Sequence, residues 1–181
     1  YFFILTLFLQ KGLQLPPMQA GYFVVAQGSG FISASVLTAK LLLRYGRAVL
    51  IFGVLMIIGA VILQLFTFYH NGSSYVRLTI MFLHGLGVAL VLPSFANIAI
   101  SGLTEKLAGN ASGLYVTVQQ LFGAFGIALT GAVFYHMVKG GDNFGSYYNA
   151  FLHGMAINII CLIGVLILLV LLPKSSLPNC D

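Results

Sequence analysis

Long stretches without a charged residue dominate this sequence and limit what it can fold into. Each is long enough to cross a hydrocarbon core roughly 30 Å thick, which takes about 20 apolar residues. The charge-free stretches are residues 16–39, 48–68, 78–104, 107–138 and 143–173. Only 6% of all residues are charged, whereas a soluble domain carries roughly 25%. We therefore predict an all-α, polytopic membrane helix bundle.

The first residues predict one more membrane helix, present only in part. Residues 1–9 are apolar, and Gln10, Lys11 and Gly12 interrupt them. At about 1.5 Å per residue this segment spans less than half of a bilayer, and it lacks the basic start of a signal peptide. The alternative is a short interfacial segment. We expect about six transmembrane helices, the first truncated, in a bundle over residues 1–173 of a longer protein, with a tail over 174–181.

Basic residues predict how the bundle sits in the membrane. Successive loops alternate between the two sides, so one side carries Lys40, Arg44, Arg47, Lys106 and Lys174. The other side carries Lys11, Arg77 and Lys139. Because cytoplasmic loops are enriched in Lys and Arg, we expect a cytoplasmic C-terminus in a bacterial inner (plasma) membrane protein. The same bias explains most of the net charge of +5, so no nucleic-acid partner is expected.

The sequence offers little chemistry for an enzyme or a cofactor. Its acids are Glu105, Asp142 and Asp181, which lie in predicted loops or at the terminus. No nucleophile elbow, phosphate-binding loop or metal-ligand spacing occurs, so we expect no enzyme, no cofactor and no metal. A haem between His84 and His153 is a minor alternative. We expect both histidines near the membrane interface.

The stretch 109–132 separates small and polar residues from bulky ones. At about 100° per residue, one stripe holds Gly109, Gly113, Thr117, Gln120, Ala124 and Gly131. In a membrane, bulky residues meet lipid, while small and polar residues face other helices or a watered cavity. Gln120 and Thr117 are therefore candidates for a substrate pathway, and Gly109 and Gly113 for close helix packing. Gln119 points about 100° away from Gln120.

Two other stretches carry polar residues in apolar surroundings. Gln27 lies in the stretch 16–39, and Ser94 and Asn97 share a face of the stretch 78–104. Gly85, four residues before an alanine, has the spacing of closely packed membrane helices. Two interpretations remain open for the polar residues: they line a pathway, or they join helices and bond their own backbone.

The segment from residue 40 to residue 48 resembles a signature of the major facilitator superfamily. Its sequence, KLLLRYGRA, is similar to the degenerate copy of the motif G-x-L-a-D-R-x-G-R-R, which lies between the second and third helices of the C-terminal half. Arg44, Gly46 and Arg47 match the motif, and Leu43 stands where the motif has its Asp. The resemblance implies a gating turn at the three matching residues.

The stretch 109–132 is similar to the pattern N-T-x-R-Q-L-G-G-A-x-G-x-A of the 14-span drug:proton antiporters (multidrug efflux). The matching residues are Thr117, Gln120, Leu121, Gly123, Ala124, Gly126 and Ala128. Gln119 replaces the Arg of the pattern, and Phe122 replaces a Gly. The resemblance implies a C-terminal six-helix half in which Gly123, Ala124 and Gly126 pack against neighbouring helices.

The resemblance also implies a secondary transporter that works by alternating access around a midplane site. Its expected partners are the lipid bilayer, a small-molecule substrate and protons, with Phe31 and Leu90 as contacts for a lipophilic solute. Coupling acids are expected in the other half, because membrane proton transfer needs a titratable group. Efflux of drugs or other lipophilic or cationic small molecules is the leading hypothesis. The alternatives are import of a polar metabolite and a non-transport accessory or haem-bearing membrane subunit.

Overall fold

The computed structural model describes residues 1–181 except 71, 101–103, 139–142 and 172–181, and gives residues 105 and 106 as backbone only. Its elements are α1 (Phe2–Leu7), η1 (Phe8–Gly12), α2 (Pro17–Tyr45), α3 (Arg47–Tyr69), α4 (Ser74–Ile100), α5 (Glu105–Val138) and α6 (Phe144–Leu171). Over the described ranges five helices are long and apolar enough to cross a membrane. The prediction of an all-α membrane helix bundle is therefore confirmed. The predicted tail at 174–181 and the basic residues Lys139 and Lys174 lie outside the described residues.

Two helices extend past charged residues that bound their charge-free stretches. α2 continues through Lys40 and Arg44, and α4 begins before Arg77. A charged side chain is costly inside the hydrocarbon but not at its boundary. A charged residue therefore marks where the helix leaves the hydrocarbon, and the helix itself can continue beyond it. At about 1.5 Å per residue, a helix as long as α2 exceeds the hydrocarbon thickness. Pro17 in the first turn of α2 fits its beginning, because the first helical N–H groups need no partner within the helix.

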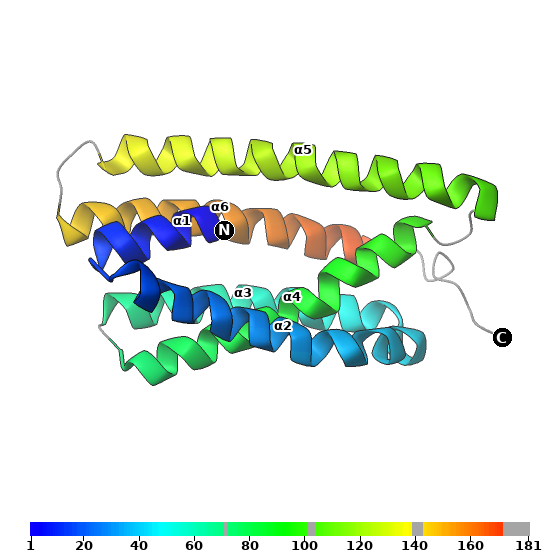
Figure 1. The fold of residues 1–181 in the computed structure, drawn as a ribbon, viewed down its shortest axis with the longest axis horizontal. Coiled ribbons are helices and arrows are strands. Elements are labelled where there is room, and N and C mark those ends of the chain that lie inside the picture. The colour runs from blue at the N-terminus through cyan, green and yellow to red at the C-terminus, as the bar shows by residue number, and fades with distance from the viewer. Residues whose placement is uncertain (71, 101–103, 139–142, 172–181) are drawn as a thin grey trace.

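The helices form two groups (Figure 1). α2, α3 and α4, which follow one another in the sequence, pack together. α5 and α6 pack with α1 and η1, which come from the beginning of the chain. The second group therefore joins the two ends of the described chain, and α3–α6 and α4–α5 contacts hold the two groups together.

The closest contact in the bundle joins α2 to α4 through glycine. A Cβ atom at Gly30 would overlap the backbone carbonyl of Phe82, and a Cβ atom at Gly85 would overlap the carbonyl of Gln27. Further along, the Thr38 hydroxyl lies within hydrogen-bond distance of the Ala89 carbonyl, at 3.1 Å. Small residues allow this approach because no side chain stands between the two backbones.

α3 packs onto α4 in the same manner. Cβ atoms built on Gly53 and Gly87 would lie 3.2 Å and 3.1 Å from the carbonyl oxygen of the other glycine. Ile57 fills the space next to Gly87. The helix over residues 47–69, which is the bulkiest of the spans, is thus held by contacts through a few small positions.

An aromatic cluster joins the two groups of helices at one end of the bundle. The ring of Phe8 in η1 stacks on Phe151 of α6, with centroids 4.4 Å apart. The ring of Phe68 in α3 meets both edge-on, at 5.6 Å and 6.0 Å. All three side chains are at most 1% exposed. Aromatic pairs in these geometries add to the stability gained from burial, so this cluster fixes the end of η1 between α3 and α6.

α5 lies along the outside of the bundle (Figure 1). Its buried side chains include Thr130 and Phe134, and Gly131 lies against Phe3 of α1. Before these residues, bulky side chains such as Leu121 and Phe122 are exposed. The early part of α5 therefore has no cover from the described chain.

Gly30 and its neighbour Gly28 provide a matched test of the α2–α4 contact. A Cβ atom at Gly28 meets nothing within 4 Å, whereas one at Gly30 overlaps backbone. We expect Gly30→Ala to lower the free energy of unfolding by about 1–3 kcal/mol, the range for overpacked sites. Gly28→Ala should be neutral or stabilising by roughly 0.5–1 kcal/mol, because Ala favours helix. The apparent Tm of the full-length protein in detergent checks both, and equal Tm values would contradict the close contact.

Candidate transport pathway

Two of the predicted pathway residues are buried, Gln27 in α2 and Ser94 in α4. Gln27 is 4% exposed, and its backbone carbonyl lies against Gly85. Ser94 is fully buried, and its hydroxyl donates to the Leu90 carbonyl of its own helix at 2.7 Å. Among the described residues, the Oε1 atom of Gln27 has no hydrogen-bond partner. Since buried polar atoms are normally paired, Gln27 retains capacity for a water molecule or a solute, and Ser94 bonds within its helix.

The other predicted pathway residues lie on surfaces that the described chain leaves open. Asn97 of α4 is exposed, as are Thr117 and Gln120 of α5. Phe31 of α2 is half-buried. The Thr117 hydroxyl donates to the Gly113 carbonyl at 2.8 Å, so its own helix already uses its donor. The structure thus divides the predicted pathway into a buried pair and an open set, in which Asn97 and Gln120 are exposed on the surface of the described chain.

The four glycines that were predicted to pack α5 against other helices contact no other helix in the described part of the chain. A Cβ atom at Gly109, Gly113, Gly123 or Gly126 would meet nothing within 4 Å, and Ala124 is exposed. The physical reason is that α5 reaches the bundle core further along, at Thr130 and Phe134. Spacing of small residues predicts a surface suited to close packing but does not name the helix that covers it. Gly85, in contrast, lies against the backbone of α2.

Gly46 alone joins α2 to α3 in the predicted gating turn. It has φ 51° and ψ −125°, a backbone conformation that glycine adopts at little cost and other residues rarely adopt. Its N–H donates to the Leu42 carbonyl at 2.7 Å. Arg44 is exposed, with its guanidinium 5.4 Å from the centre of the Tyr45 ring, and Arg47 is half-buried at the start of α3. The turn therefore presents basic side chains on a backbone that depends on one glycine.

A buried polar cluster between α1, α3 and α4 was not predicted. The Tyr1 hydroxyl donates to Oε1 of Gln64 at 2.8 Å, and Nε2 of Gln64 lies 3.7 Å from the Met81 sulfur. The His84 ring stacks on Tyr1, with centroids 4.3 Å apart, and is 3% exposed. We expected His84 near the membrane interface; the structure buries its ring against Tyr1, nearly three turns after the start of α4 at Ser74. Hydropathy alone gave no signal for this burial.

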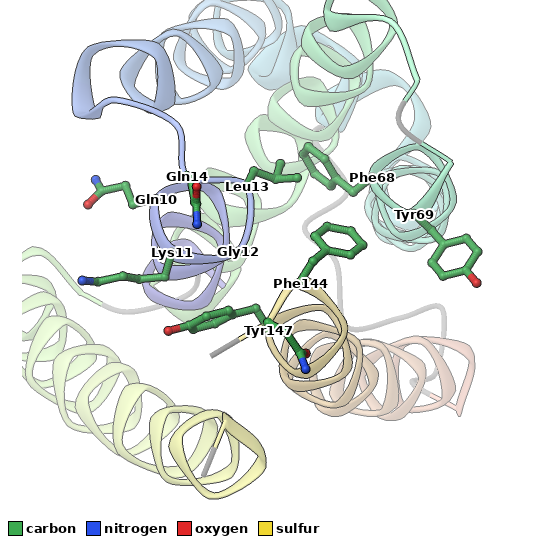
Figure 2. Close-up of a pocket in the computed structure, with 10 residues that line it drawn as sticks. Gln10, Lys11, Gly12, Leu13, Gln14, Phe68, Tyr69, Phe144 and Tyr147 are labelled. Atoms are coloured by element: carbon green, nitrogen blue, oxygen red, sulfur yellow. The ribbon is translucent and has the colours of Figure 1, made fainter. Parts of the chain in front are cut away.

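A pocket at one end of the bundle was also not predicted. It has a volume of about 680 Å³ and lies between η1, the end of α3 and the beginning of α6 (Figure 2). Its lining residues are Gln10, Lys11, Gly12, Leu13, Gln14, Phe68, Tyr69, Asn143, Phe144 and Tyr147. The interruption of the first apolar segment at residues 10–12 was the only available sequence signal. None of the predicted pathway residues lines this pocket.

The helix lengths and contacts define the chain as an integral, polytopic α-helical membrane protein. Comparison with known families gives the more specific assignment. The family model described as Major Facilitator Superfamily matches residues 1–127. The chain belongs to the Major Facilitator Superfamily.

Curated relatives of the chain come from Streptomyces. A probable actinorhodin transporter of Streptomyces coelicolor is 27% identical over 139 residues, which are 75% of this chain and 24% of that protein. A puromycin resistance protein of Streptomyces alboniger is 29% identical over 92% of this chain and 35% of its own length. A lincomycin resistance protein of Streptomyces lincolnensis is 32% identical over 78% of this chain and 29% of its own length. The chain thus spans between a quarter and about a third of these relatives.

Gly46 offers a test of the turn. We expect Gly46→Ala to lower the free energy of unfolding by about 1–3 kcal/mol, the cost of holding a residue with a Cβ atom in a sparsely populated region of φ and ψ. Gly59→Ala is the matched control in α3, where an added Cβ meets nothing within 4 Å. Apparent Tm values of the two variants check the prediction. A Gly46→Ala protein as stable as Gly59→Ala would show that the turn tolerates a side chain.

Proposed function

We propose that the chain is the C-terminal six-helix half of a secondary transporter that exports drugs or other lipophilic or cationic small molecules by alternating access. Membership of the Major Facilitator Superfamily supports transport. The names of the relatives, an antibiotic transporter and two antibiotic resistance proteins, support export of antibiotic-like compounds. The substrate of this protein is proposed from these names and from the chemistry of the helices.

The open face of α5 is the observation that carries this proposal. Thr117 and Gln120 are exposed on a membrane helix, and nothing lies within 4 Å of a Cβ atom at Gly113 or Gly123. Polar side chains in a membrane face protein or a water-filled cavity rather than lipid. A second helix bundle facing α5 would satisfy this requirement. The space between the two bundles would then be the substrate pathway, with Gln120 and Asn97 on its wall.

Proton coupling in this proposal depends on residues outside this chain. The acids of the sequence are Glu105, Asp142 and Asp181, and none lies in a charge-free stretch. A membrane-embedded carboxylate that takes up a proton or pairs with a cationic substrate would therefore come from the other half. We propose a cytoplasmic C-terminus on the same argument from basic loops. On that side, the exposed Arg44 and its neighbour Arg47 would belong to the gating turn.

Gln120 tests the pathway directly. We expect Gln120→Ala in the full-length protein to reduce efflux of a fluorescent lipophilic cation severalfold, because the wall loses an amide that bonds the passing solute. Gln119→Ala is the matched control, since Gln119 is also exposed but points about 100° away. Efflux is measured in cells at equal membrane expression. If Gln120→Leu exports the same compounds at the same rate as the unmodified protein, Gln120 is not on the pathway.

Deletion of the gene separates export from import. An exporter protects the cell, so its loss should increase sensitivity to lipophilic antibiotics at least severalfold while growth on single nutrients stays normal. Minimum inhibitory concentrations and growth rates are the measurements, with the cloned gene returned as a control. Unchanged antibiotic sensitivity together with a lost ability to use one nutrient would contradict the proposal and favour import of a polar metabolite.

A further inference from the structure

The pocket at the end of η1 differs in character from the proposed pathway. It is formed by η1 and the residues that follow it, the last turn of α3 and the first turn of α6 (Figure 2). Its volume of about 680 Å³ falls within the range of small-molecule sites, about 300–1,000 Å³. The open face of α5 with Gln120 is not part of its lining. A ligand in this pocket would therefore bind outside the proposed substrate pathway.

The inner side of the pocket is aromatic and rigid. Phe68 and Phe144 line it, and behind them the buried ring of Phe8 lies 5.6 Å from Phe68 and 6.2 Å from Phe144, centre to centre. Phe144 also stacks on Tyr148 with centroids 6.0 Å apart. These contacts hold the rings in place, so an apolar group can bind against Phe144, the exposed ring of the two, at a small entropic cost.

The outer side of the pocket is polar and basic. Lys11, in the last turn of η1, is exposed and carries the positive charge. Gln10, Gln14 and Asn143 add amide groups, and no acid occurs among the described lining residues. The Oδ1 atom of Asn143 accepts the N–H of Ser146 at 2.8 Å, which leaves its amide N–H groups to donate. The described lining therefore favours an acceptor with negative charge over a cation.

The pocket lies where membrane-spanning helices end. α3 ends at Tyr69 and α6 begins at Phe144, and both helices are long and apolar enough to cross the bilayer. Aromatic residues gather at the boundary between lipid and water, and lysine side chains extend from apolar surfaces toward that boundary. At this level of the membrane, a phospholipid has acyl chains on one side of its glycerol and a phosphate on the other. The apolar inner side of the pocket matches the acyl chains, and the basic outer side matches the phosphate.

We propose that this pocket binds the headgroup region of an anionic phospholipid. The phosphate lies at Lys11 with the amides of Gln14 and Asn143, and the glycerol and upper acyl chains lie against the exposed ring of Phe144, with the buried Phe68 behind it. A free phosphate ion would use the basic side alone and leave the aromatic side in water. A lipid without net negative charge would use the aromatic side but gain less from Lys11.

The chain around the pocket suggests what the lipid would stabilise. η1 is a π-helical turn, and Gln14 just beyond it has φ 52°, a conformation costly for a residue with a side chain. A Cβ atom at Gly12 would lie 3.0 Å from the Cβ of Tyr147, so this turn is pressed closely onto α6. A ligand that bridges Gln14 and the first turn of α6 favours this arrangement over relaxed ones, because it binds only when both are in place.

Lipid-dependent stability tests the proposal. We would titrate the detergent-purified full-length protein with dioleoylphosphatidylglycerol or dioleoylphosphatidylcholine and record the apparent Tm. The anionic lipid should raise the Tm more than the zwitterionic one. Lys11→Gln should weaken apparent affinity for phosphatidylglycerol about fivefold, the effect expected of one basic residue at an anionic membrane surface. Lys40→Gln, an exposed lysine near the other end of α2, is the matched control and should change nothing.

Three results would overturn the proposal. The first is an equal rise of Tm with both lipids. The second is a Lys11→Gln protein that binds phosphatidylglycerol as tightly as the Lys40→Gln protein. The third is full reproduction of the effect by inorganic phosphate or soluble glycerol phosphate, which would show a free-anion site. Lys11→Arg keeps the charge and should retain the lipid preference, and its failure to do so would also count against a phosphate contact.

Discussion

The contact of α2 with α4 through bare backbone is the interaction on which the rest of the bundle depends. In lipid there is no hydrophobic force between helices, so association rests on close packing and on bonds between polar groups. Gly30 and Gly85 supply the packing, and Thr38 adds a hydroxyl within 3.1 Å of the Ala89 carbonyl. α3 then docks on the opposite side of α4 through Gly53. Without the first contact, α4 would have no fixed position against which α3 could pack.

A second kind of contact joins this core to the remaining helices. The rings of Phe8, Phe68 and Phe151 come from η1, α3 and α6, and all are buried. The α2–α4 contact is close because glycines leave no side chains between the two backbones. The aromatic cluster, in contrast, joins helices through large side chains that fill the space between them. Phe68 also lines the pocket, and Phe8 lies behind it. Packing between the helices and a potential lipid site therefore share Phe68.

The sequence predicted the membrane spans because hydropathy reports directly on the solvent around a helix. It also predicted Gly85 as a residue of a close contact, since its spacing to an alanine is local information. It did not predict that the described chain leaves Gly113 uncovered or that His84 is deeply buried, because both depend on which helices meet in space. The helix ends were missed for a related reason, since Lys40 marks the membrane boundary and α2 passes through it. The pocket draws on η1, α3 and α6, so no single motif encodes it.

The one-residue joint at Gly46 has a mechanical consequence. α2 and α3 both extend from it toward the same end of the bundle (Figure 1), and α3 is about 35 Å long at 1.5 Å per residue. A change of about 5° in the angle between the two helices would displace the far end of α3 by about 3 Å. That end carries Phe68 and Tyr69, which line the pocket on the opposite face of the membrane. A small change of the backbone angle beside Arg44 and Arg47 would therefore produce a larger displacement of the pocket residues at the other membrane surface.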